Sequence, residues 1–233
     1  MNAVAGGGSF VSFPAMVFAG LPPVAANASS TVALFPGTVA SAWAYRSGFV
    51  DVGEVRLRWM LPVTVAGGLA GAILLLGTPT HVFDQVIPWL LLLATLTFVF
   101  GARLGAVLRR VVRVGPATLL VIQFLISIYG GYFGGAVGLM MLAAWGLLTA
   151  SLDVKAMAPV RTILISAANG AAVILFLASG VVRWPETLAL LAGAVAGGYG
   201  GAHVGRLLPR GLVRAWVLLL TAAITAVFFA RAW

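Results

Sequence analysis

Long uninterrupted apolar runs make up most of this chain, and they decide which solvent its surface can face. Only 8% of the 233 residues are charged, 62% are hydrophobic and the mean hydropathy is +1.11. A soluble domain carries about 25% charged residues, because ions must cover its surface. Runs of about 20 apolar residues can instead cross a bilayer as helices. Because the runs do not alternate in polarity as barrel strands do, we predict an all-α polytopic membrane protein embedded in the lipid bilayer.

Short polar connections divide the chain into apolar segments, which we expect to be the helices. The segments lie at about residues 9–20, 24–45, 57–77, 85–108, 116–149, 156–178, 185–203 and 212–230. The Arg-rich connections lie at residues 46–58, 103–113 and 203–214. The positive-inside rule places such connections in the cytoplasm. The net charge of +9 therefore reflects membrane topology, and no nucleic-acid partner is predicted.

The segment at residues 116–149 is too long to be one span. As a straight helix it would measure about 51 Å, against a hydrocarbon core of about 30 Å. It contains several glycines, which weaken a helix: Gly130, Gly131, Gly134, Gly135 and Gly138. The Arg-rich connections share one side of the membrane only if this segment returns to the side it left. We therefore predict two short helices, 117–129 and 139–149, joined by a Gly-rich break as a hairpin or a re-entrant pair.

The sequence also repeats itself at a spacing of 130 to 132 residues. Residues 65–72 (Val-Ala-Gly-Gly-Leu-Ala-Gly-Ala) match residues 195–202, and residues 47–50 match residues 179–182. Together with the loop charges, this predicts two inverted repeats with Gly-interrupted segments, at residues 1–108 and 109–233. Such repeats are typical of transporters, which place their binding site near the bilayer midplane. The repeat also predicts a short helix before the first Gly-rich turn, where this sequence begins.

Ordered motifs in both halves carry a resemblance to a known family. In the first half they are Gly6, Gly7, Gly8, Ser9, Phe10, Pro14, Gly20, Leu21, Pro22, Pro23, Ala25, Ala28, Ser29 and Ser30, followed by residues 47–51 and 67–71. In the second half they are residues 130–135, Arg161, Thr162, Asn169, Gly170, Ser179, Gly180 and residues 197–202. On these residues the sequence resembles the sulfite exporter TauE/SafE family of bacterial membrane transporters. The resemblance covers essentially the whole chain. It departs from the family at the second Gly-rich turn, where Ala136 and Val137 interrupt the glycines.

The resemblance implies a secondary transporter that exports a small anion, with sulfite or an organosulfonate as the expected substrate. It also implies the cytoplasmic (inner) membrane of a bacterium, with a multi-pass chain. The sequence leaves open whether the chain acts alone or as a homodimer. An anion channel or a non-transporting membrane partner subunit are the alternative functions, and saturable flux would separate a carrier from a channel.

Arg161 is the first candidate for binding the anion. A guanidinium bonds an oxyanion in a bidentate manner, and ionisable residues inside a membrane are usually functional. Thr162 follows it, and Asn169 extends a polar face along the same predicted helix. The alternative is that Arg161 lies close enough to the helix end to reach the interface.

Two further groups complete the predicted substrate site. The first is a polar cluster in the segment 24–45, formed by Asn27, Ser29, Ser30, Thr31 and Thr38; its alternative role is helix packing. The second is the pair of Gly-rich turns, formed by Gly6, Gly7, Gly8 and Ser9 and by Gly134 and Gly135. Helix N-termini at such turns would present backbone N–H groups to an anion, whereas glycines there could also serve only as hinges. Gly67, Gly68, Gly71, Gly197, Gly198 and Gly201 are expected to be packing surfaces.

Several chemistries are not expected. The chain has no cysteine and only His81 and His203 as histidines, so no metal site and no cofactor are predicted. No phosphate-binding loop of the GxxxxGK[ST] form occurs, so ATP does not drive transport within this chain. An intramembrane serine protease would need a histidine deep in a span, and both histidines lie at segment ends. We therefore predict that the protein is not an enzyme. Because the acidic residues lie at segment edges, uniport and anion exchange stay open as transport modes.

Overall fold

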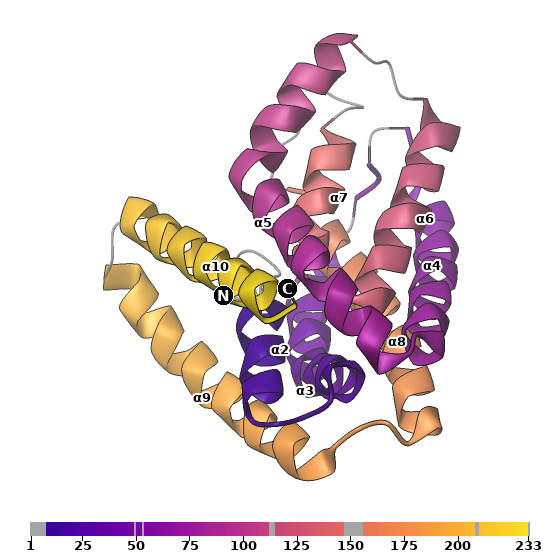
Figure 1. The fold of residues 1–233 in the computed structure, drawn as a ribbon. Helices are drawn as coiled ribbons and strands as arrows, with labels where there is room; N and C mark the ends of the chain where they lie inside the picture. Colours follow the sequence, from indigo (N-terminus) through magenta and orange to yellow (C-terminus); the bar gives the residue numbers. More distant parts are fainter. Residues whose placement is uncertain are drawn as a thin grey trace.

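The computed structural model describes residues 8–48, 50–52, 54–111, 115–146, 156–207 and 210–232. Within these residues the fold is helical throughout, apart from turns and one isolated bridge between Val52 and Val55. The helices, shown in Figure 1, are α2 (Ser9–Phe18), α3 (Pro23–Ala44), α4 (Leu57–Gly77), α5 (Thr80–Val111), α6 (Pro116–Tyr132), α7 (Val137–Trp145), α8 (Ala158–Ser179), α9 (Trp184–Leu207) and α10 (Arg210–Ala232). The predicted all-α class is confirmed.

Three of the described helices are long and apolar enough to cross a membrane, judged by length and composition. They are Leu57–Gly77, Thr80–Phe100 and Ala158–Ser179. Shorter apolar helices occupy Ser9–Phe18, Pro116–Tyr132 and Ala215–Arg231. Large hydrophobic side chains such as Ile73, Ile174 and Leu219 lie on the outside of the bundle, more than half exposed. This outer surface suits hydrocarbon and not water.

Proline and glycine set several of the helix ends. Helices α3 and α6 begin at Pro23 and Pro116, where a missing N–H costs no helical hydrogen bond. Helix α8 ends at Gly180, which has a left-handed φ of 68°. The Asp51 carboxylate accepts a hydrogen bond of 2.8 Å from the Leu57 N–H and so caps α4. Helix α5 begins at Thr80, directly after Pro79, which is earlier than the predicted start near residue 85.

The long segment at residues 116–149 does contain two helices, α6 and α7, but the break is shorter than predicted. We expected the first helix to end at residue 129, whereas α6 continues through Gly130 and Gly131 to Tyr132. Gly131 is helical because α4 packs directly on it, and a Cβ there would collide with the backbone oxygen of Gly68. This contact offsets the weak helix propensity of glycine. The turn is thus confined to residues 133–136, and α7 folds back beside α6 (Figure 1).

Helix α4 is held between α6 and α8 by its glycines. A Cβ at Gly67 would lie 2.6 Å from the Ser127 Cβ of α6, and one at Gly68 would lie 2.6 Å from the Ala168 oxygen of α8. Real Cβ atoms do not come this close to backbone, so only glycine permits the spacing. Van der Waals packing at such small residues drives helix association in membranes. The prediction that Gly67, Gly68 and Gly71 are packing surfaces is confirmed.

The matching glycines of the second half behave differently. A Cβ at Gly197 or Gly198 of α9 would meet no atom within 4 Å, so the expectation that they pack against another helix is wrong within the described residues. Helix α9 packs on α3, while α10 packs on α5. In Figure 1 these two helices lie to the left of the bundle formed by the other helices. The division into inverted repeats at residues 1–108 and 109–233 therefore stays a prediction.

Adding a single methyl group to α4 should test this packing. We expect Gly68→Ala to reduce the stability of the folded protein by about 2 kcal/mol, because the rigid Ala168 backbone must move. Gly77→Ala in the same helix is the matched control, since a Cβ there meets nothing within 4 Å. Thermal unfolding in detergent measures both. Equal stability of the two variants would contradict the packing role.

Candidate functional site

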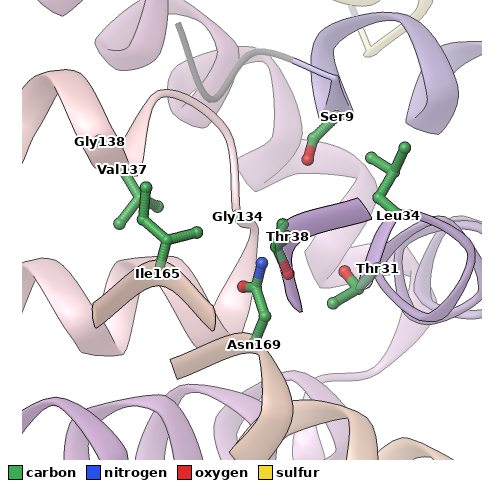
Figure 2. Close-up of a pocket in the computed structure, with 9 residues that line it drawn as sticks. All are labelled: Ser9, Thr31, Leu34, Thr38, Gly134, Val137, Gly138, Ile165 and Asn169. Carbon is green, nitrogen blue, oxygen red and sulfur yellow. The ribbon is translucent and has the colours of Figure 1, made fainter. Parts of the chain in front are cut away.

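A small polar pocket lies inside the bundle, where four helices and one turn meet. It is lined by Ser9, Thr31, Leu34, Thr38, Gly134, Val137, Gly138, Ile165 and Asn169 (Figure 2). These residues come from α2, α3, the turn at residues 133–136, α7 and α8. The cavity volume is about 20 Å³, which is room for roughly one water molecule. The sequence had predicted five of the lining residues, from four segments: Ser9, Thr31, Thr38, Gly134 and Asn169.

Two short helices begin at this pocket. Ser9 is the first residue of α2, and Val137 and Gly138 are the first two residues of α7. Helix α7 has 9 residues and α2 has 10, so each rises only about 15 Å, half the thickness of a hydrocarbon core. The N-terminus of a helix carries partial positive charge and N–H groups without an intrahelical partner. The pocket therefore receives this positive potential from two helices.

The turn before α7 is built from left-handed residues. Gly134 has a φ of 79° and Ala136 a φ of 59°. The N–H groups of Phe133 and Gly134 both donate to the Tyr129 carbonyl, at 2.9 and 3.3 Å, which closes the end of α6. Alanine in the left-handed region costs about 1 kcal/mol relative to glycine. The sequence departs from uniform glycine at this strained position.

Asn27 of α3 fixes this turn in place. Its side-chain amide donates a 2.8 Å hydrogen bond to the carbonyl of Tyr132, the last residue of α6. That carbonyl lies at a helix end and lacks an intrahelical donor. Asn27 is buried, and it does not line the pocket. The structure thus places this predicted site residue behind the turn, where it positions the backbone.

The polar side chains of the pocket divide into acceptors and donors. Thr31 and Thr38 donate their hydroxyl protons to carbonyls of their own helix, at 2.9 and 2.8 Å, which leaves oxygen lone pairs. The Ser9 hydroxyl and the Asn169 amide have no hydrogen-bond partner among the described residues. Figure 2 shows both pointing into the space between α3 and α7. These two groups can donate to a bound molecule.

Arg161 lies beside the pocket and does not line it. It is 8% exposed and is the fourth residue of α8. A Cβ added to Gly138 would be 3.1 Å from its Cδ, so the side chain crosses α7 at the glycine that lines the pocket. No described carboxylate forms an ion pair with it. Its charge is therefore uncompensated within the described residues.

The remaining predicted residues lie away from the cavity. Ser30 shares a 2.6 Å hydrogen bond with Ser12 of α2, and Ser29 accepts one of 2.9 Å from the Arg183 N–H. Thr162 donates to carbonyls in its own helix. Gly135 lies beside the Phe133 ring. Gly8 directly precedes α2, whereas Gly6 and Gly7 lie outside the described residues.

Sequence reasoning had not assigned Leu34, Val137, Gly138 or Ile165 to the site. A usable signal was present in the internal spacing. Leu34 and Ile165 are 131 positions apart, as are Thr38 and Asn169, and all four residues line the pocket. This spacing falls within the 130 to 132 residues of the sequence repeat. Applying the repeat to each residue in turn would have paired these positions.

Membrane-length helices around an internal polar pocket, with short helices that begin there, are an arrangement found in membrane transporters. The family comparison agrees. The family model described as sulfite exporter TauE/SafE matches residues 1–228, so the chain belongs to this family.

Curated relatives cover nearly the same length. A probable membrane transporter protein of Haemophilus influenzae is 28% identical over 229 residues, which is 97% of this chain and 88% of the relative. The probable membrane transporter protein YfcA of Escherichia coli K12 is 26% identical, covering 97% of this chain and 83% of the relative. The probable membrane transporter protein ORF9 of a Sinorhizobium species is 30% identical, covering 88% and 76%. No solved structure matches the chain.

The left-handed conformation of Ala136 predicts opposite changes in stability for two alanine-to-glycine substitutions. Ala136→Gly should stabilise the protein by about 1 kcal/mol, because glycine adopts positive φ without steric cost. Ala144→Gly, a buried position inside α7, should destabilise it by about 1 kcal/mol or more through lost helix propensity and packing. Thermal unfolding of both variants in one detergent measures the difference. Destabilisation by Ala136→Gly would show that the left-handed conformation is not the one adopted.

Proposed function

We propose that this protein is a secondary transporter that exports a small sulfur oxyanion, sulfite or an organosulfonate, by alternating access across the bacterial inner membrane. One observation carries the proposal: the first residues of two short helices, α2 and α7, line one polar pocket inside the bundle. Helix N-termini favour anions. Short helices whose N-termini meet at one site inside the membrane are found in secondary transporters. The sulfur substrate is inferred from the family description.

The groups around the pocket suit an oxyanion better than a cation. Ser9 and Asn169 offer hydrogen-bond donors, and the start of α7 offers backbone N–H groups. No acidic residue lines the pocket among the described residues. A cation would therefore meet two helix N-termini without a carboxylate to balance them. We therefore expect the pocket to select anions over cations by their charge.

Arg161 supplies the full charge in this proposal. A buried guanidinium without a carboxylate partner is costly, and a bound anion would lower that cost. Its aliphatic part already lies against Gly138, so rotation of the terminal bonds would bring the guanidinium toward the pocket. The charges of Arg161 and the anion would then neutralise each other only when the substrate is bound. This would favour the conformational change of the loaded transporter over that of the empty one.

The size of the cavity indicates the conformational step. At about 20 Å³ the pocket is filled by one water-sized group, and sulfite is larger than that. Substrate entry therefore requires α2 and α3 to separate from α7 and α8. Leu34 of α3 and Ile165 of α8 are the apolar side chains that line the pocket on the two sides of this boundary. Alternating access would open one end of this boundary at a time.

Flux of labelled sulfite from proteoliposomes tests the proposal. We expect saturable efflux with the native chain, and a loss of about tenfold or more in Arg161→Gln and in Asn169→Leu, because each removes a donor to the anion. Arg183→Gln is the matched control, since this arginine follows the same helix and its side chain is exposed. The control should keep native flux.

The same assay separates the alternative functions. Flux that rises linearly with concentration would indicate an anion channel. Absence of flux for sulfite, sulfonates and other sulfur oxyanions, from folded protein, would favour a non-transporting partner subunit. Equal losses in Arg161→Gln and Arg183→Gln would contradict a specific role for Arg161.

A further inference from the structure

A second polar cavity lies between the beginning of α5 and the end of α10, and it shares no lining residue with the first pocket. It has a volume of about 260 Å³ and is lined by His81, Asp84, Gln85, Phe228 and Arg231. This is room for several water-sized groups. We call it the headgroup cavity. It takes no part in the transport proposed above.

Charges of both signs face the headgroup cavity without neutralising each other. Asp84 and Arg231 both line it, and within the described residues neither forms an ion pair or a hydrogen bond. A cavity that keeps a carboxylate and a guanidinium apart is complementary to a zwitterion. Its anionic group would bond Arg231 in a bidentate manner, and its cationic group would donate to Asp84. His81 adds a further polar contact at the first turn of α5.

Apolar side chains continue directly from the cavity along one face of α5. Trp89, Leu93, Leu96 and Phe100 are all about half exposed. They follow Gln85 at spacings of three and four residues, which places them on one side of the helix. The stripe from residue 89 to residue 100 is about 16 Å long at 1.5 Å per residue. This length suits an acyl chain.

The two helices close together below the cavity. The rings of Trp89 and Phe229 meet edge to face with centroids 5.2 Å apart, and Thr95 and Thr225 share a 3.3 Å hydrogen bond. A bound molecule therefore cannot extend between α5 and α10. Its apolar part must leave along the outer stripe, while its polar part stays in the cavity. An exposed tryptophan at this level is typical of the membrane interface.

We propose that the headgroup cavity binds a phospholipid whose headgroup carries a phosphate and a primary ammonium, as in phosphatidylethanolamine. The phosphate lies against Arg231 and the ammonium against Asp84, while one acyl chain follows the stripe on α5. A choline headgroup has no N–H to donate to Asp84. A purely anionic headgroup places negative charge beside the same carboxylate. The apolar stripe favours a lipid over a free zwitterion.

Native mass spectrometry of the full chain in detergent tests this with three lipids of identical acyl chains: phosphatidylethanolamine, phosphatidylcholine and phosphatidylglycerol. We expect the native protein to retain phosphatidylethanolamine about tenfold more tightly than the other two, a typical worth of one charge-assisted pair. Asp84→Asn should remove the preference over phosphatidylglycerol. Arg231→Gln should weaken retention of all three lipids. Glu54→Gln and Arg58→Gln, exposed charges in the connection before α4 and at its start, are the matched controls and should keep the native preference.

Two results would overturn the proposal. Equal retention of the three lipids by the native protein would show that the cavity does not distinguish their headgroups. An unchanged preference in Asp84→Asn would show that selectivity arises elsewhere. Soluble phosphoethanolamine identifies the source of the ligand: displacement of the lipid at equal concentration would mean that the acyl chain contributes nothing and that the ligand is a free zwitterion.

Discussion

The interrupted helix at residues 133–136 is the feature on which the rest of the bundle depends. In hydrocarbon, irregular backbone is tolerated only where protein or a polar cavity satisfies its N–H and C=O groups. Here the Tyr132 carbonyl receives a hydrogen bond from Asn27, and the start of α7 faces the polar pocket. The polar pocket is thus located where the backbone needs polar surroundings. The break and the site require each other.

Close glycine contacts hold the elements that surround this break. Gly67 and Gly68 bring α4 against α6 and α8, and that contact keeps α6 helical as far as Tyr132. Only then does the turn begin at a fixed place relative to α3. Buried polar pairs add direction to this packing: Gln123 donates to Thr64 of α4 at 2.9 Å and accepts from the Trp145 indole of α7 at 3.3 Å. The short helix α7 is thereby tied to α6 and, through Gln123, to α4.

The sequence predicted the helices well because their ends depend on local chemistry. Pro23, Pro116 and Gly180 begin or end helices through their own backbone restrictions. The end of α6 was not predictable in the same way, because Gly131 stays helical through a contact with Gly68, 63 positions earlier in the chain. Similarly, nothing local indicates that Asn27 bonds the Tyr132 carbonyl while Thr31, one turn later, lines the pocket. Neighbours in space decide these roles.

The two halves of the pocket also differ in a way that bears on mechanism. Thr38 and Asn169 occupy positions 131 residues apart and both face the cavity, yet the same spacing pairs Arg161 with Ser30. The Ser30 hydroxyl is hydrogen-bonded to the Ser12 hydroxyl, and this bond joins α3 to α2. The first half therefore uses this position to fix two helices together, while the second half uses it for a charge. For the proposed anion transport one buried cation is sufficient, because a second buried guanidinium would stay uncompensated when a single anion is bound. The geometry can be shared between halves, whereas the charge cannot.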